Sequence, residues 1–162
     1  MIRIPKNHIT VSEPYKIDIL LSFLECPGGW RWMRVNDTCI WESRERKSFD
    51  DAVKRCQVLY PGGARLYEPP NKSHNDLTSS ILSIETDHWI GIHERLSEDS
   101  WLYLSSNERV HNINWDRESG QPNDHNEVDQ DCVTILSNNG YRWNDDSCDT
   151  ERHFICEKKL LV

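Results

Sequence analysis

The sequence predicts an α+β domain with two helices and a set of short strands, and three observations carry this prediction. Two segments place apolar residues at helical spacing, later segments alternate short apolar runs with turn residues, and six cysteines are spread along the chain. The 162 residues are 36% hydrophobic and include seven tryptophans, which suffices for one domain with a substantial core. Residues 26–162 are expected to form that domain, and residues 1–25 a neck or N-terminal extension.

A hairpin followed by a helix is predicted at the start of the domain. Residues 30–41 alternate as a hairpin does, with Asn36-Asp37 at the turn position. Ser48 is the expected N-cap of the helix, with Asp51 at the capping-box position, and Pro61-Gly62-Gly63 ends it. The apolar face expected to pack on the core consists of Phe49, Ala52, Val53, Cys56 and Tyr60.

A second helix is predicted from Ser73, with Leu77, Ile81 and Ile84 as its apolar stripe. Core packing explains such stripes better than a partner-binding groove does. The strands expected after it are residues 88–92, 101–104, 132–136, 141–143 and 154–156, with Asn139-Gly140 as a hairpin turn. Residues 105–131 are long, polar and without clear periodicity, which is typical of a functional loop.

The negative charge is concentrated in one segment. The formal net charge is −8, and residues 116–151 hold ten acidic residues against Arg117 and Arg142. A solvated acidic loop is the simplest explanation of such a run. Nucleic acid and anionic membranes are unfavourable partners for this face, whereas a cation is a favourable one.

The cysteine pattern indicates disulfides rather than a metal site. No two cysteines form a Cys-x-x-Cys pair, which disfavours zinc, and an even, widely spread set suggests three disulfides formed in an oxidising compartment. Spacing alone does not choose among the fifteen pairings. Sequons at Asn36 and Asn71 agree with a glycoprotein that is secreted or lies on the extracellular face of the plasma membrane. No signal or transmembrane segment is visible, since Asp18 and Ser22 interrupt the apolar run 17–24.

Several short motifs follow one another in an order that one family shares. They are Cys26-Pro27, Trp30, Trp89-Ile90-Gly91-Ile92, Gln121-Pro122-Asn123, Asp131-Cys132-Val133, Trp143-Asn144-Asp145 and Phe154-Ile155-Cys156-Glu157. Through them, residues 26–157 resemble a C-type lectin domain of the long form. The resemblance implies a mainly antiparallel sheet, a calcium-bearing long loop and three disulfides, which are Cys26–Cys39, Cys56–Cys156 and Cys132–Cys148.

The resemblance also implies a principal calcium site that binds sugar. The matching positions are Gln121, Asn123, Gln130, Asn144 and Asp145. Calcium accepts seven or eight oxygen ligands in flexible geometry, so two vicinal sugar hydroxyls complete its coordination while they hydrogen-bond to Gln121, Asn123, Asn144 and Asp145. Pro122 is expected to follow a cis peptide bond.

Two departures from the family pattern weaken this expected site. The triplet is a Gln-Pro-Asn hybrid of the mannose- and galactose-associated forms, and Gln130 replaces the usual acid. Asp145 is then the one carboxylate of the carried-over set, which predicts weak calcium binding because affinity follows ligand charge. Glu127 or Asp129 are the candidate substitutes, although strand alternation would point Asp129 away from Gln130.

An auxiliary calcium site is also implied by the resemblance. Its positions are Glu94, Glu98, Asp124 and Asp131, all of which are acidic. Ordinary surface charge is the alternative explanation for these four residues. Such a site would order the long loop and so support the sugar site.

The expected function is therefore that of a calcium-dependent lectin for mannose-type or galactose-type glycans. The alternative is a domain of the same fold with a weakened calcium site that binds a protein ligand. We expect no enzymatic activity, because the sequence suggests no nucleophile and base together.

Trp101, Tyr103 and Tyr141 are candidate platforms for the apolar face of a galactose ring, although core or surface packing explains them better. Weak single-site affinity would require homo-oligomers for useful avidity.

Overall fold

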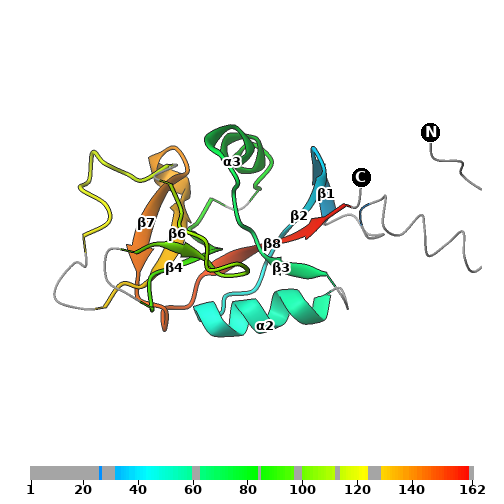
Figure 1. Cartoon of the computed structure of the whole chain (residues 1–162). Helices are drawn as coiled ribbons and strands as arrows, with labels where there is room; N and C mark the ends of the chain where they lie inside the picture. The colour runs from blue at the N-terminus through cyan, green and yellow to red at the C-terminus, as the bar shows by residue number, and fades with distance from the viewer. Residues whose placement is uncertain are drawn as a thin grey trace, which may run out of the picture.

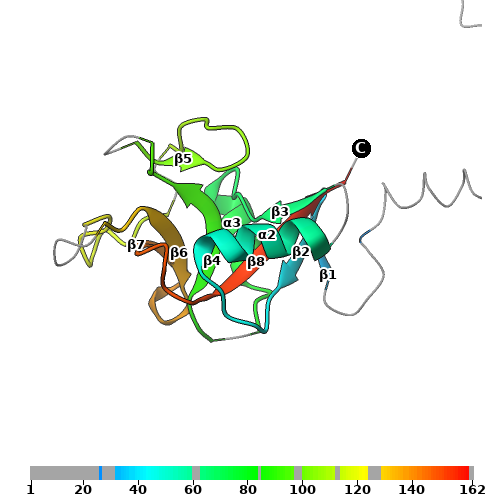
Figure 2. The same ribbon diagram turned by 90° about the horizontal axis from the view of Figure 1, so that it is seen from below.

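A computed structural model of the chain shows one large sheet with a helix on either side of it (Figure 1). The strands follow the order β1-β2-β8-β4-β6-β7, with β3 paired to β8 and β5 paired to β4. Helices α2 and α3 lie on opposite sides of the strands, as the view from below also shows (Figure 2). The structure describes residues 26, 32–59, 63–83, 85–96, 100–111, 114–123 and 129–160.

The elements follow the predicted order of hairpin, two helices and short strands. Their bounds are β1 Trp32–Val35, β2 Thr38–Glu42, α2 Phe49–Leu59, β3 Ala64–Leu66, α3 Lys72–Ser79, β4 His88–His93, β5 Leu102–Tyr103, β6 Cys132–Leu136, η2 Ser137–Asn139, β7 Arg142–Asp146 and β8 His153–Lys159. The α+β class and the mainly antiparallel sheet are confirmed, since β4 and β8 form the parallel pair among these ladders. The short strand β3 was not predicted.

The β1–β2 hairpin and α2 form where local sequence signals place them. Asn36 adopts a left-handed conformation (φ 54°) at the predicted turn, which asparagine tolerates better than most residues. The Asp51 amide donates to the Ser48 hydroxyl at 3.4 Å, so Ser48 caps α2 as expected. Phe49, Ala52 and Cys56 are buried, and Val53 packs partly against them. Tyr60, the last residue of the predicted face, lies outside the described residues.

The prediction for α3 was wrong in both its start and its buried face. The helix begins at Lys72, and the Asn71 side chain caps it by accepting from the His74 amide at 2.8 Å. Leu77 is 46% exposed, whereas the buried residues of the helix are His74, Asn75, Thr78 and Ser79. Ile81 follows the end of the helix and is half-buried against the core, as predicted, and Ile84 lies outside the described residues.

Polar contacts decide which face of α3 turns inward. The Trp143 indole N–H donates to the Asn75 Oδ1 atom at 2.9 Å, and the Tyr67 hydroxyl lies 3.0 Å from His74 Nδ1. Because buried polar groups are stable when they are hydrogen-bonded, these pairs help a polar helix face to pack on the core. On the same face, His74 Nε2, Asn75 Nδ2, Thr78 Oγ1 and Ser79 Oγ are buried without a hydrogen-bond partner among the described residues.

The three disulfides join the residues that the resemblance implies, namely Cys26–Cys39, Cys56–Cys156 and Cys132–Cys148. The second ties α2 to β8 across 100 residues, and in the chain-entropy model such closure contributes on the order of 4–5 kcal/mol. Within the described part of the chain, no helix has the length and apolar character needed to cross a membrane.

Gly91 allows β4 to approach the segment that follows β3. Its amide donates to the Tyr67 carbonyl oxygen at 2.7 Å. A Cβ atom at Gly91 would lie 2.8 Å from Glu68 Cγ, which is shorter than Cβ contacts allow, and 3.0 Å from the Leu66 carbonyl oxygen, which is a tight contact. The glycine of the Trp-Ile-Gly motif is therefore required by packing.

Candidate functional site

The part of the long polar stretch before the Gln-Pro-Asn triplet is anchored to β7. The Trp143 amide donates to the Asn114 carbonyl at 2.8 Å, and the Asp116 amide donates to the Trp143 carbonyl at 2.9 Å. Trp115 packs edge-on against Trp143, with ring centroids 5.7 Å apart. These contacts fix the approach to the triplet beside the strand that carries Asn144 and Asp145.

Asp116 joins this anchor to the triplet, a role that sequence reasoning did not foresee. Its carbonyl oxygen accepts from the amides of Ser119, at 3.2 Å, and Gln121, at 3.0 Å. Its buried carboxylate accepts from the Asn139 side chain and lies 3.4 Å from Arg142 Nη1. A hydrogen bond from Ser119 and the nearby Arg142 charge hold the pKa of Asp116 below its ordinary value. The Asp116 carboxylate therefore stays ionised at neutral pH. The Asp116 carbonyl, through its hydrogen bond from the Gln121 amide, positions the start of the triplet.

The triplet meets β7 through one short hydrogen bond. The Asn123 amide donates to Asp145 Oδ2 at 2.8 Å, and the Asp145 side chain is 1% exposed. The Gln121–Pro122 peptide bond is cis, as expected. The Gln121 Oε1 atom is buried and has no hydrogen-bond partner among the described residues. A buried amide oxygen without a donor is costly unless another group, such as a cation, binds it.

The register between β6 and β7 determines which residues lie opposite Asn144 and Asp145, the two residues of the Trp-Asn-Asp motif that follow Trp143. Asn144 pairs with Thr134, and Asp145 pairs with Val133. The Thr134 hydroxyl donates to the Asn144 carbonyl at 3.3 Å. The Asn144 side-chain nitrogen donates to the Asp145 carbonyl, which turns the amide oxygen of Asn144 away from that carbonyl.

The other predicted ligands are distributed between the ends of β4 and β6. Gln130 is half-buried two residues before Cys132, and Asp129 is exposed. The Glu94 amide donates to the Asp131 carbonyl at 3.0 Å, so the structure brings these two auxiliary-site positions together. Glu94 is 6% exposed, and Asp131 is half-buried. Three predicted ligands lie outside the described residues, namely Glu98, Asp124 and Glu127.

The donor atoms present suit a hard cation better than a soft one. Among the described residues, no three His, Cys, Asp or Glu side chains converge as a metal would require. The set expected at the principal site instead offers amide oxygens and the Asp145 carboxylate, and all six cysteines are in disulfides. Oxygen donors alone are what calcium prefers, and the buried Gln121 oxygen fits such an ion.

Trp101 belongs to the core and is no platform for a sugar ring. Its side chain is 8% exposed and packs against Trp115 with ring centroids 4.8 Å apart. Tyr103 is half-buried, and its hydroxyl donates to the Pro69 carbonyl at 2.7 Å. Burial raises the pKa of Tyr103 to about 12. Tyr141 is half-buried at a turn with a φ of 58°.

Comparison with known proteins gives one consistent result. A family model described as "Lectin C-type domain" matches residues 45–158. A C-type lectin galactose-binding isoform from Hoplocephalus stephensii is 33% identical, with 83% of this chain and 84% of that protein covered. A perlucin-like protein from Mytilus galloprovincialis is 30% identical, with 82% and 83% covered. The carbohydrate-recognition domain of the mouse scavenger receptor C-type lectin superimposes with a TM-score of 0.74 at 26% identity, covering 85% of this chain and 100% of that domain.

Proposed function

The chain belongs to the C-type lectin domain family, and from this premise we propose that it binds glycans through a calcium ion held at the triplet. The hydrogen bond between the Asn123 amide and Asp145 is the observation that carries this proposal. It joins the Trp-Asn-Asp motif to the Gln-Pro-Asn triplet, whose first residue, Gln121, has a buried side-chain oxygen without a partner among the described residues. The relatives are lectins, and binding without catalysis is the activity we assign.

The proposed ligand sets are those of the sequence analysis. Principal ligands are Gln121, Asn123, Gln130, Asn144 and Asp145, auxiliary ligands are Glu94, Glu98, Asp124 and Asp131, and Glu127 and Asp129 are possible substitutes. When bound, calcium would supply open coordination positions for two vicinal sugar hydroxyls. The chain's own amide and carboxylate groups would hydrogen-bond to the same hydroxyls and orient the ring.

A single principal carboxylate implies weak calcium binding, in the class of extracellular modules with dissociation constants of about 0.1–1 mM. Extracellular calcium would fill such a site. Three disulfides support the same compartment, since they persist where the environment is oxidising. The sequon residues Asn36 and Asn71 are exposed, which is compatible with attached glycans.

The side chains of the triplet bear on sugar preference. Gln121 and Asn123 are both amides, so each can donate one hydrogen bond and accept another. We therefore expect the site to accept both mannose-type and galactose-type hydroxyl pairs, weakly in each case. Avidity from homo-oligomers or clustered glycans would then be needed for useful binding.

The test is retention of the disulfide-bonded domain on immobilised mannose and galactose, with calcium and with EDTA. Calcium titration calorimetry of the same protein counts the metal sites. Retention that needs calcium would support the proposal. The replacement of the usual acid by Gln130 favours a second candidate, a domain that binds protein. If the domain is not retained on either sugar column and the calorimetric titration shows no calcium binding at the principal site, the protein-binding candidate is favoured.

A further inference from the structure

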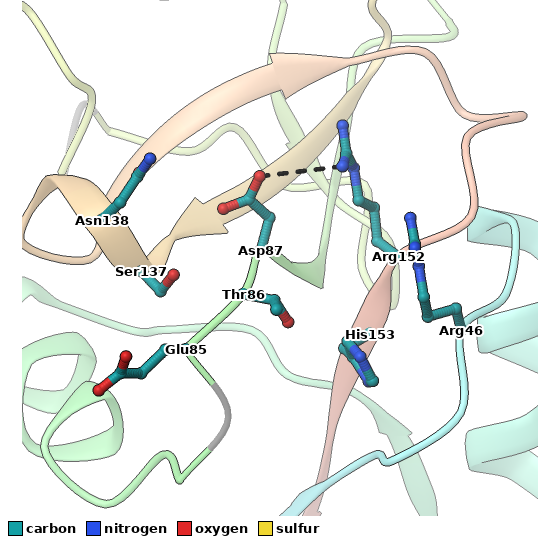
Figure 3. Close-up of a pocket in the computed structure, with 8 residues that line it drawn as sticks. All are labelled: Arg46, Glu85, Thr86, Asp87, Ser137, Asn138, Arg152 and His153. Atoms are coloured by element: carbon teal, nitrogen blue, oxygen red, sulfur yellow. Dashed lines mark ion pairs between the residues drawn. The ribbon is translucent and has the colours of Figure 1, made fainter.

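The structure contains a polar cavity, and Figure 3 shows the side chains that line it. It has a volume of about 310 Å³ and opens between the start of β4, the η2 turn and the start of β8. The residues that line it are Arg46, Glu85, Thr86, Asp87, Ser137, Asn138, Arg152 and His153. All eight are polar or charged, and none belongs to either proposed calcium-ligand set.

The register of β4 separates this cavity from the auxiliary calcium positions. His88, the first residue of β4 and the neighbour of Asp87, pairs with Ile135 of β6 and His153 of β8. His93, the last residue of β4, pairs with Cys132, and the neighbours of these two residues in the chain are the auxiliary acids Glu94 and Asp131. The cavity and those acids therefore lie at opposite ends of the same strand.

Two arginines and a histidine lie together on one side of the cavity (Figure 3). Arg46 donates through Nε, at 3.1 Å, and Nη2, at 2.7 Å, to the neutral carbonyl oxygen of Glu151. In the part of the chain that the structure describes, Arg46 forms no ion pair, so its charge is oriented but not neutralised. Arg152 is held through Nε by Asp146 Oδ2 at 2.8 Å.

The facing residues offer acceptors and hydroxyl groups. The Asp87 carboxylate lies 3.9 Å from Arg152 Nη1, a separation at the outer limit of an ion pair. Ser137 and Asn138 come from the η2 turn, and each can donate and accept hydrogen bonds. A ligand that fits both sides carries a negative group beside the arginines and, at its other end, hydroxyls that can donate to the carboxylates of Asp87 and Glu85.

We propose that this cavity binds a single sugar ring bearing a carboxylate, a uronic acid being the simplest case, without calcium. The carboxylate would lie between Arg46 and Arg152 and accept from the guanidinium N–H groups that Glu151, Asp146 and Asp87 leave open. The ring hydroxyls would meet Asp87, Ser137 and Asn138. The volume is at the lower end for small-molecule sites, which suits one ring. Because every lining residue is polar or charged, the cavity suits a hydroxylated ring better than an apolar carboxylate.

The experiment is nitrogen–proton NMR of the disulfide-bonded domain in EDTA, titrated in parallel with glucuronate, glucose and acetate. We expect saturable shifts from glucuronate at the amides of Asp87, Ser137, Asn138 and His153. Glucose has the ring hydroxyls without the carboxylate, and acetate has the carboxylate without the ring. Each should therefore bind at least about fivefold more weakly than glucuronate. Equal binding of acetate would overturn the sugar assignment, and shifts absent or centred on Asn144 and Asp145 would overturn the site.

A pair of arginine variants provides the matched test. Arg46→Gln should weaken glucuronate binding about fivefold, because one exposed charge partner is lost. Arg44→Gln changes an exposed arginine of the same loop that does not line the cavity, and it should bind as the parent does. A thermal melt establishes that both variants are folded. If Arg44→Gln weakens binding as much as Arg46→Gln, the attraction is general surface charge and the proposal fails. Since EDTA removes calcium, this result is independent of the proposed lectin function.

Discussion

The backbone amide of Asn123 donates to the Oδ2 atom of Asp145 at 2.8 Å, across 22 residues of sequence. Asp145 is a proposed calcium ligand, and through this bond it also supports the loop that carries the triplet. The two tasks differ chemically, because the hydrogen bond needs an acceptor oxygen whereas a calcium ligand of high affinity needs negative charge. An amide at position 145 keeps the acceptor and removes the charge.

Asp145→Asn should therefore lower the affinity of the principal calcium site by about tenfold or more while the loop stays attached. Calcium-dependent retention on immobilised mannose or galactose should fall with it. Titration calorimetry measures the first effect, and column retention in calcium measures the second.

Asp149→Asn is the matched control for this variant. Asp149 is exposed beside Cys148 and has no proposed role at the site. Its substitution removes the same charge and should leave calcium binding within about twofold of the parent. Calcium binding by Asp145→Asn equal to that of Asp149→Asn would show that Asp145 is no ligand.

Gln130→Glu should raise calcium affinity by about tenfold, because it returns a carboxylate to a position at which the family usually has an acid. Gln57→Glu adds the same charge on the exposed face of α2 and serves as the control. Calorimetry in low salt compares the two. An equal response in both variants would mean that Gln130 does not touch the ion.

The parts of the fold that sequence predicted are those governed by local signals. The Ser48 cap and the spacing of Phe49, Ala52 and Cys56 predict α2, and all of these signals lie within the helix or directly before it. Asn36 favours the turn of the first hairpin for a reason internal to its own backbone. The disulfide pairing and the cis peptide bond came from the family resemblance, since spacing alone left fifteen pairings open.

The parts that sequence missed depend on contacts between distant residues. Leu77 was expected inward on α3, but the distant indole of Trp143 selects the face that carries Asn75. The link from Asp116 to Gln121 is a hydrogen bond between backbone groups. Because backbone groups are common to nearly all residue types, no pattern of side chains in the sequence predicts it. The three-residue β3 is too short to show a period. All of the proposed calcium-ligand roles stay predictions, those of Gln121, Asn123 and Asp145 included.

Gly91→Ala should destabilise the domain by about 1–3 kcal/mol, because a Cβ atom there would lie 2.8 Å from Glu68 Cγ and 3.0 Å from the Leu66 carbonyl. Chemical denaturation measures the change in the free energy of unfolding. Gly63→Ala is the control, since its Cβ atom would meet nothing within 4 Å. That control should be neutral or stabilising by up to about 1 kcal/mol. Similar losses in both variants would contradict the packing argument.

Glu157 should make the domain less stable as the pH rises through neutrality. The side chain is 0% exposed, and burial raises its pKa to about 7 against the partial opposition of Lys159 and Arg65. Arg65 Nε lies 2.8 Å and Lys159 Nζ 3.8 Å from the carboxylate. Because the unfolded chain releases this proton near the ordinary pKa of 4.5, the folded state binds more protons between that pH and 7. The stability that protonation contributes is complete below pH 4.5 and is lost as the pH passes 7.

Glu157→Gln is uncharged at every pH and removes this dependence. Relative to the variant, the parent should lose on the order of 2–3 kcal/mol of unfolding free energy between about pH 5 and pH 8. Burial lowers the pKa of His74 and His153, which changes stability in the opposite direction, but both proteins share that effect and it cancels in the difference. Denaturation of the parent, Glu157→Gln and the exposed control Glu151→Gln at both pH values measures it. A difference between parent and Glu157→Gln that does not change with pH would mean that Glu157 is ionised throughout the range and that Arg65 and Lys159 outweigh its burial.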